Sequence, residues 1–125
     1  MMELTPLFQS LIDQDQNPIV LCDTEHVIRY MNPAAISAYA SYGGEALMGK
    51  RVMNCHKPAS RAAIEKVVTW FAQDKAHNRV HTMFVEKENL DVYMIALRGA
   101  DGQLIGYYEQ QVCRIPDPAP LYELQ

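Results

Sequence analysis

Apolar residues recur along the chain with two periods, and each period predicts a type of secondary structure. Between Leu4 and Ile12 they return every three or four residues, which is typical of one face of a short helix. Thr5 followed by Pro6 is a start signal for that helix, because a hydroxyl can cap free N–H groups and proline fits the first turn. The same spacing predicts three further helical segments: 33–40, 45–48 and 60–74.

The longest of these helices is expected to follow Ser60, whose hydroxyl can cap it. Its apolar face consists of four residues: Ile64, Val67, Val68 and Phe71. We expect the preceding segment, Asn54 to Ser60, to be a hinge. Pro58 lacks an N–H group and restricts Lys57 to extended geometry, so the chain enters the helix by a defined turn.

Five short apolar-rich runs predict strands: 18–22, 26–32, 80–87, 90–98 and 103–114. Turn-forming stretches such as Asp23-Thr24-Glu25 and Gly99-Ala100-Asp101-Gly102 separate them. The order of elements therefore predicts an α+β fold. We expect a five-stranded antiparallel sheet with helices packed on one face and an N-terminal flanking helix.

The composition is that of a single globular domain, with 125 residues, 49% hydrophobic and 21% charged. The longest apolar stretch, Val92 to Leu97, is far shorter than the roughly 18 residues that cross a bilayer. The N-terminus also lacks the basic cluster and apolar run of a secretory signal. We therefore expect a cytoplasmic protein that does not bind membranes.

Charge and motifs narrow the classes of function. A net charge of -4 without a stripe of Lys or Arg argues against binding of nucleic acid, because such binding rests on neutralised phosphates. Three cysteines, Cys22, Cys55 and Cys113, fit neither a disulfide framework nor a zinc site, so we expect free thiols and no metal. There is no phosphate-binding loop or nucleophile elbow, and we expect no enzyme.

Several stretches, read in order, resemble the PAS family. NPIVLCDTEHVIRYMNPAA is similar to the opening hairpin of PAS domains, EALMGKRV to their short-helix segment, and GADGQLIGYYEQQ to their last hairpin. The stretch from Asn54 to Ser60 resembles the CHPPKS segment of a PAS subgroup found near DUF438 and hemerythrin-like domains. The resemblance covers roughly residues 10–113. It implies a flanking helix (1–16), a PAS domain (17–114) and a proline-rich tail (115–125).

This resemblance implies a sensory or scaffolding role. PAS domains bind haem, flavin, fatty acids, small metabolites or nothing, and they pass a signal through flanking helices. Many end the last strand with Asp-Ile-Thr leading into a signalling helix, whereas this chain has Cys113-Arg114-Ile115 and then prolines. We therefore expect the output to pass through a separate signalling protein.

Two neighbouring residues are candidates for cofactor chemistry. Cys55 follows Asn54, as the reactive cysteine does in flavin-binding light sensors, but the residues after it differ from that motif. His56 lies just before the longest helix, near the place where haem-binding PAS domains carry their iron ligand. A hydrogen-bonded structural role is the alternative for His56. A contact with an organic ligand, including its carboxylate, is the role that we select.

Adaptable methionines and tyrosines mark a candidate pocket in the C-terminal strands. We expect a cavity between strands 80–87, 90–98 and 103–114 and the helix 60–74. The predicted ligand-binding set consists of six residues: His56, Cys55, Met83, Tyr93, Met94 and Tyr108. Core packing is the alternative for each of the four methionines and tyrosines.

Three hypotheses follow for the function: a sensor of a small organic ligand, a haem-based gas or redox sensor, and a ligand-free dimerisation module. We also expect a homodimer, because the apolar stripe of the N-terminal helix needs cover on a partner subunit. Packing of this stripe against its own sheet is the alternative.

Overall fold

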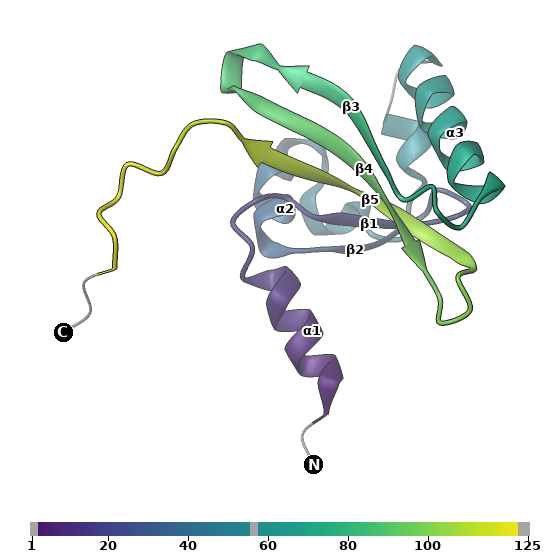
Figure 1. The fold of residues 1–125 in the computed structure, drawn as a ribbon, viewed down its shortest axis with the longest axis horizontal. Helices are drawn as coiled ribbons and strands as arrows, with labels where there is room; N and C mark the ends of the chain where they lie inside the picture. Colours follow the sequence, from purple (N-terminus) through teal and green to yellow (C-terminus); the bar gives the residue numbers. More distant parts are fainter. Residues whose placement is uncertain (1–2, 56–57, 123–125) are drawn as a thin grey trace.

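The computed structural model describes residues 3–55 and 58–122, which form one antiparallel sheet with helices on one face (Figure 1). The α-helices are α1 (Leu4–Asp13), α2 (Pro33–Ala38) and α3 (Pro58–Gln73). The strands are β1 (Val20–Asp23), β2 (Ile28–Met31), β3 (Arg79–Val85), β4 (Leu90–Arg98) and β5 (Leu104–Cys113). Short 3-10 helices connect them: η1 (Ala40–Tyr42), η2 (Gly44–Leu47), η3 (Val52–Cys55) and η4 (Glu86–Glu88).

The strand order β2-β1-β5-β4-β3 places the first and last strands side by side at the centre. All neighbouring strands are antiparallel. The core forms between this sheet and the helices, with Phe71 of α3 and Met31 of β2 among its most buried side chains. The structure thus confirms the predicted α+β fold with helices on one face and an N-terminal helix.

Glycine permits the close pairing of the two central strands. Gly106 of β5 lies opposite Asp23 of β1. A Cβ atom at this position would lie 2.2 Å from the carbonyl oxygen of Cys22, well inside van der Waals contact. The absence of a side chain at Gly106 therefore allows β1 to reach its ladder position beside β5.

The helix α1 projects from the sheet and meets the rest of the domain near its C-terminal end (Figure 1). The Tyr30 hydroxyl of β2 donates a hydrogen bond to the Asp13 carboxylate, and the Asn32 amide donates to the Ile12 carbonyl. No residue of α1 is buried. Helix α1 is therefore attached by polar contacts at one end, and its apolar stripe is uncovered.

Two predicted helix starts were wrong. Helix α1 begins at Leu4 with Glu3 in the N-cap position, so Thr5 lies inside the first turn. Helix α3 begins at Pro58, which suits a first position because the N–H group that proline lacks would have no helical partner there. Ser60 is therefore the third helical residue and not the cap.

The second predicted strand begins two residues late, at Ile28, for a conformational reason. His26 has a φ of 66°, in the left-handed region, which interrupts the extended backbone of a strand. Its amide donates to the Asp23 carbonyl and closes the turn between β1 and β2. His26 is thus a turn residue, and its left-handed backbone conformation sets the direction of its side chain.

Candidate functional site

A cavity of about 290 Å³ lies between the helices and the centre of the sheet. Strands β1, β2 and β5 form most of its floor, Met94 of β4 joins them, and Ile64 of α3 and Leu47 of η2 lie among the helical residues across from it. Fifteen of the described residues line it: Pro18, Val20, Cys22, Ile28, Met31, Tyr39, Tyr42, Leu47, Val52, Ile64, Met94, Tyr107, Tyr108, Glu109 and Gln111.

The described lining combines an apolar interior with a few hydroxyl and amide groups and one carboxylate. Burial raises the pKa of the Cys22 thiol to about 11, so that thiol is protonated at neutral pH. Burial also raises the pKa of the Tyr39 hydroxyl, and the charge of Glu109 raises it further. Burial is likewise the main cause of the raised pKa of Tyr107. These three groups are therefore neutral, and Glu109 is the one acidic side chain among the described lining residues.

Strand alternation determines which side chains of β5 face the cavity. Because successive side chains point to opposite faces of a sheet, Tyr107, Glu109 and Gln111 share one face, and Tyr108 faces the other. Tyr107 is buried, and its register partner on β4 is Ala96, which packs against the core. The cavity-facing set of β5 is therefore made of Tyr107, Glu109 and Gln111.

Tyr107 also connects the cavity to a second concavity on the surface. Its hydroxyl shares a hydrogen bond of 2.7 Å with Nδ1 of His26, and the two rings meet edge to face. His26 lines an open groove that also includes Arg51 and Glu65. Burial and then the positive charge of Arg51 lower the pKa of His26, which favours a neutral ring. The pair thus joins the cavity wall to the groove.

The predicted site residues divide into three groups. Met94 and Tyr108 lie at the cavity lining. Met83 is half exposed on β3, and Tyr93 stacks on His81 and under Arg79 on the opposite face, so neither lies at the cavity. His56 lies outside the described residues, as does the side chain of Cys55. The ligand-binding role of the six residues stays a prediction.

The sequence predicted a cavity against the three C-terminal strands. In the structure it lies mainly against β1, β2 and β5. No described residue of β3 lines it, because β3 is an edge strand at the end of the order β2-β1-β5-β4-β3. The pairing of β1 with β5 brings Val20 and Cys22 to the cavity instead. Only the long-range strand order could reveal this shift.

Sequence reasoning missed Tyr39, Glu109 and Gln111 as cavity residues. A signal was present in β5, where alternation places Glu109 and Gln111 on the same face as Tyr107. The predicted Tyr108 lies at the cavity lining beside Tyr107, although strand alternation turns its side chain toward the other face. Tyr39 carried no comparable signal, because a helix C-cap position does not specify a neighbour on a distant strand.

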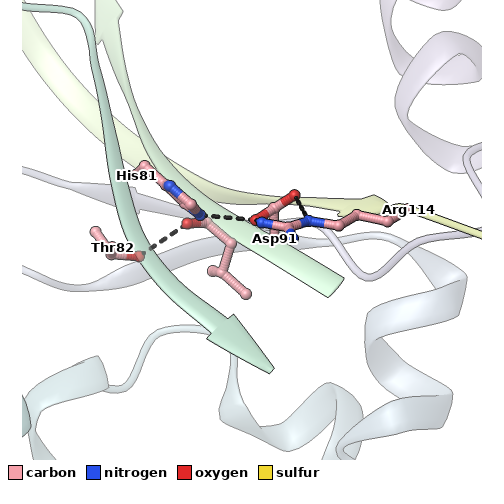
Figure 2. Close-up of polar contacts among 5 residues, drawn as sticks. His81, Thr82, Asp91 and Arg114 are labelled. Atoms are coloured by element: carbon pink, nitrogen blue, oxygen red, sulfur yellow. Dashed lines mark hydrogen bonds and ion pairs between the residues drawn. The ribbon is translucent and has the colours of Figure 1, made fainter. Parts of the chain in front are cut away.

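A charged cluster occupies the other face of the sheet near the end of β5 (Figure 2). The buried Asp91 carboxylate accepts two hydrogen bonds of 2.7 Å from the guanidinium of Arg114, and Nε2 of His81 lies 2.8 Å from it. The guanidinium also lies 4.0 Å from the ring centre of Phe84. This cluster connects β3 and β4 to the residue that follows β5, and it is separate from the cavity.

The described lining lacks the two side chains that most often bind haem iron in sensors and oxygenases. No described lining residue is a histidine, and burial raises the pKa of Cys22 so that it is held as a thiol and not a thiolate. The cavity volume of about 290 Å³ lies just below the range of roughly 300–1,000 Å³ that is typical of small-molecule sites. Among the described residues, no group of three or more His, Cys, Asp or Glu could hold a metal ion.

In the part of the chain that the structure describes, no helix combines the length and the apolar character needed to cross a membrane.

Comparison with known proteins agrees with this architecture. The chain matches the family described as PAS fold over residues 12–110. No curated protein matches it in sequence. A solved PAS domain from Colwellia psychrerythraea is similar, with 16% identity and a TM-score of 0.64, covering 89% of this chain and 97% of that one.

Two further structures share the fold. The Aer2 receptor from Vibrio cholerae, a dual PAS-heme oxygen sensor, has 20% identity and a TM-score of 0.57, covering 78% of this chain and 94% of that one. VqmA bound to DPO has 16% identity and a TM-score of 0.57, covering 88% of this chain and 58% of that one. At these identities the likeness extends to the fold.

Proposed function

Because the chain belongs to the PAS family, we propose that it is a sensory module that binds a small organic molecule in the cavity and signals to a separate protein. PAS domains are generally sensory modules and not enzymes. The observation that carries the proposal is the cavity of about 290 Å³ between the sheet and the helices η1, η2 and α3, with an apolar lining and a few polar groups. Such a combination is typical of sites that bury a small ligand and orient it by a few hydrogen bonds.

The cavity favours a ligand-binding role over a ligand-free dimerisation module. Protein interiors are packed about as densely as organic crystals, and a void of this size loses many dispersion contacts. A ligand would restore those contacts. VqmA, part of which shares this fold, has been observed bound to DPO. The haem alternative rests on His56, and the described residues of the lining add no support to it.

A cavity-filling substitution tests the proposal. Small molecules released from the purified protein by denaturation are identified by mass spectrometry, and the visible absorption spectrum separates haem and flavin from colourless ligands. Val20→Phe adds a ring inside the cavity and is expected to abolish binding of the ligand identified. Val112→Phe makes the same change on the exposed face of β5 and serves as the matched control. Equal binding by both variants would contradict a ligand in this cavity.

We also propose that the chain forms a homodimer through the stripe of α1. Leu4, Leu7, Phe8 and Leu11 are between 48% and 74% exposed, so they do not pack against their own sheet. Association of two copies would bury these side chains, each worth about 1.5–3 kcal/mol when fully buried. Light scattering at micromolar concentration should show a dimer that Leu7→Glu dissociates and Gln9→Glu leaves intact. A monomeric wild-type protein would contradict this proposal.

We also propose that the chain belongs to the CHPPKS-like subgroup and that His56 contacts the ligand. Both depend on residues 54–60, of which 56–57 lie outside the described part. His56→Ala is expected to weaken binding of the identified ligand and to leave the thermal midpoint nearly unchanged. Unchanged binding would remove the contact role of His56.

A further inference from the structure

A hydrogen-bonded chain of three side chains runs from the cavity to the surface groove. The Cys22 thiol and the Tyr107 hydroxyl are hydrogen-bonded to each other at the cavity lining. The same hydroxyl lies 2.7 Å from Nδ1 of His26, which lines the groove. Cys22 and Tyr107 are buried, whereas His26 is half-buried. The chain therefore connects two buried cavity groups to a ring that can exchange a proton with solvent.

We propose that this chain is a proton switch, in which protonation of His26 reverses the hydrogen bonds of Tyr107 and changes the group that the cavity wall presents. In the neutral state, Nδ1 of His26 accepts from the Tyr107 hydroxyl, and the Tyr107 oxygen accepts from the Cys22 thiol. In the protonated state, Nδ1 donates to the Tyr107 oxygen, and the hydroxyl proton turns to the sulfur of Cys22. This inference goes beyond the proposed function, because it requires a proton in the groove and no ligand in the cavity.

The number of protons on each group separates the two states. A protonated imidazole carries an N–H on both ring nitrogens and can only donate, so an oxygen 2.7 Å from Nδ1 has to accept from it. Tyr107 keeps its single hydroxyl proton at neutral pH, because burial raises its pKa. That proton leaves the direction of His26 when Nδ1 becomes a donor. The sulfur of Cys22, which already shares a hydrogen bond with this hydroxyl, is then its acceptor.

The backbone holds the ring of His26 beside Tyr107. The amide of His26 donates to the Asp23 carbonyl at 3.0 Å, and its carbonyl accepts from the Val52 amide at 2.7 Å. The rings of His26 and Tyr107 meet edge to face with their centres 5.6 Å apart. Because the residue is held on both sides of its Cα atom, the hydrogen bond can reverse without movement of the backbone. The switch can therefore operate within the folded domain.

Charged groups from several elements surround His26 and determine when it takes up a proton. Asp23 ends β1, Glu25 lies in the following turn, Arg51 lies between η2 and η3, and Glu65 lies on α3. Burial and then the charge of Arg51 lower the pKa of His26, and the opposing effects of Glu65 and Asp23 are smaller. The switch therefore stays in its neutral state above pH 6.5 and changes state in acid.

Infrared absorption of the Cys22 S–H bond reports the state of the switch from inside the cavity. The band is assigned by its loss in Cys22→Ala. A thiol that donates a hydrogen bond absorbs at lower frequency than one that does not. The band should therefore shift to higher frequency as pH falls through the titration of His26. NMR of the ring nitrogens follows that titration separately and should find the proton of the neutral ring on Nε2.

Three substitutions separate the members of the chain. His26→Gln removes the titrating ring, so the Cys22 band should become independent of pH. Tyr107→Phe interrupts the chain, so the band should lose its pH dependence while His26 still titrates. His81→Gln removes a histidine from the other face of the sheet and should leave the shift of the band unchanged.

Two results would overturn the switch. One is a Cys22 band that stays constant in the wild-type protein while His26 titrates. The other is a neutral ring with its proton on Nδ1, because Tyr107 would then accept from His26 in both states. Either result leaves the proposed sensor function standing, since neither measurement involves a ligand.

Discussion

Substitution of Asn32 should destabilise the domain and release α1 from it. Asn32 is fully buried and joins three parts of the structure. Its Oδ1 accepts hydrogen bonds of 2.9 Å from the backbone N–H of Ile19, next to β1, and from that of Ala35, which caps α2. Its Nδ2 donates to three backbone carbonyls: Ile12 at 3.0 Å, Asp15 at 3.3 Å and Asn17 at 3.0 Å.

The cost of Asn32→Ala follows from these contacts. Loss of the cap on α2 costs about 1 kcal/mol. The amide of Ile19 lies in a partly buried position, and leaving it without a partner costs about 1–3 kcal/mol. The carbonyls of Asp15 and Asn17 belong to exposed residues and can be rehydrated. The free energy of unfolding should therefore fall by about 3 kcal/mol, which lowers the thermal midpoint of a domain of this size by about 12 °C.

Asn32→Asp separates the acceptor contacts of Asn32 from its donor contacts. A carboxylate keeps both acceptor contacts, but at neutral pH it places a negative charge against three carbonyl oxygens, which raises the pKa of the new carboxyl. Since the folded state then holds a proton more tightly than the unfolded chain, stability is highest in acid and falls as pH rises above about 4. Asn32→Ala should not show this pH dependence of stability.

Thermal unfolding followed by circular dichroism between pH 4 and pH 7 measures both effects, and Asn17→Ala, at an exposed position, is the matched control. Hydrogen exchange of the α1 amides should rise in both Asn32 variants, since Nδ2 no longer holds the Ile12 carbonyl. A loss of less than about 4 °C for Asn32→Ala would refute the assignment of this network as the attachment of α1.

Three further substitutions test other parts of the structure. Burial lowers the pKa of His26 below 6.5, so stability should fall as pH drops through 6.5, and His26→Gln should flatten this part of a denaturation profile. Hydrogen bonds from an arginine lower the pKa of Asp91 below 3.8, so its contribution is present above pH 3.8 and is lost below it; Asp91→Asn should show a smaller acid-induced loss in urea titrations, and an identical loss would contradict the ion pair. Gly106→Ala forces a Cβ against the Cys22 carbonyl and should lower the free energy of unfolding by about 3 kcal/mol, while Gly99→Ala, which meets nothing closer than 3.5 Å, should lower it by less than about 1 kcal/mol.

The sequence by itself determined most local elements. The predicted strand 90–98 coincides with β4, because a β-rich run between Glu88-Asn89 and a glycine turn has clear limits. The apolar spacing from Ile64 to Phe71 likewise identified the buried face of α3. The sequence did not determine where helices begin. Ser60 can cap a helix and Pro58 can occupy its first position, and the structure shows that α3 begins at Pro58.

Only the tertiary structure decided where the cavity lies and which groups meet in it. The pairing of β1 with β5 joins segments about 85 residues apart, brings Cys22 beside Tyr107, and leaves β3 at an edge. The same pairing brings His26 to the Tyr107 hydroxyl, and the packing of the helices brings Tyr39 within reach of Glu109. Local rules act over a few residues along the chain, whereas strand order and register depend on the packing of the whole core. A shift of one residue in register exchanges the two faces of a strand, so the cavity residues follow from that packing alone.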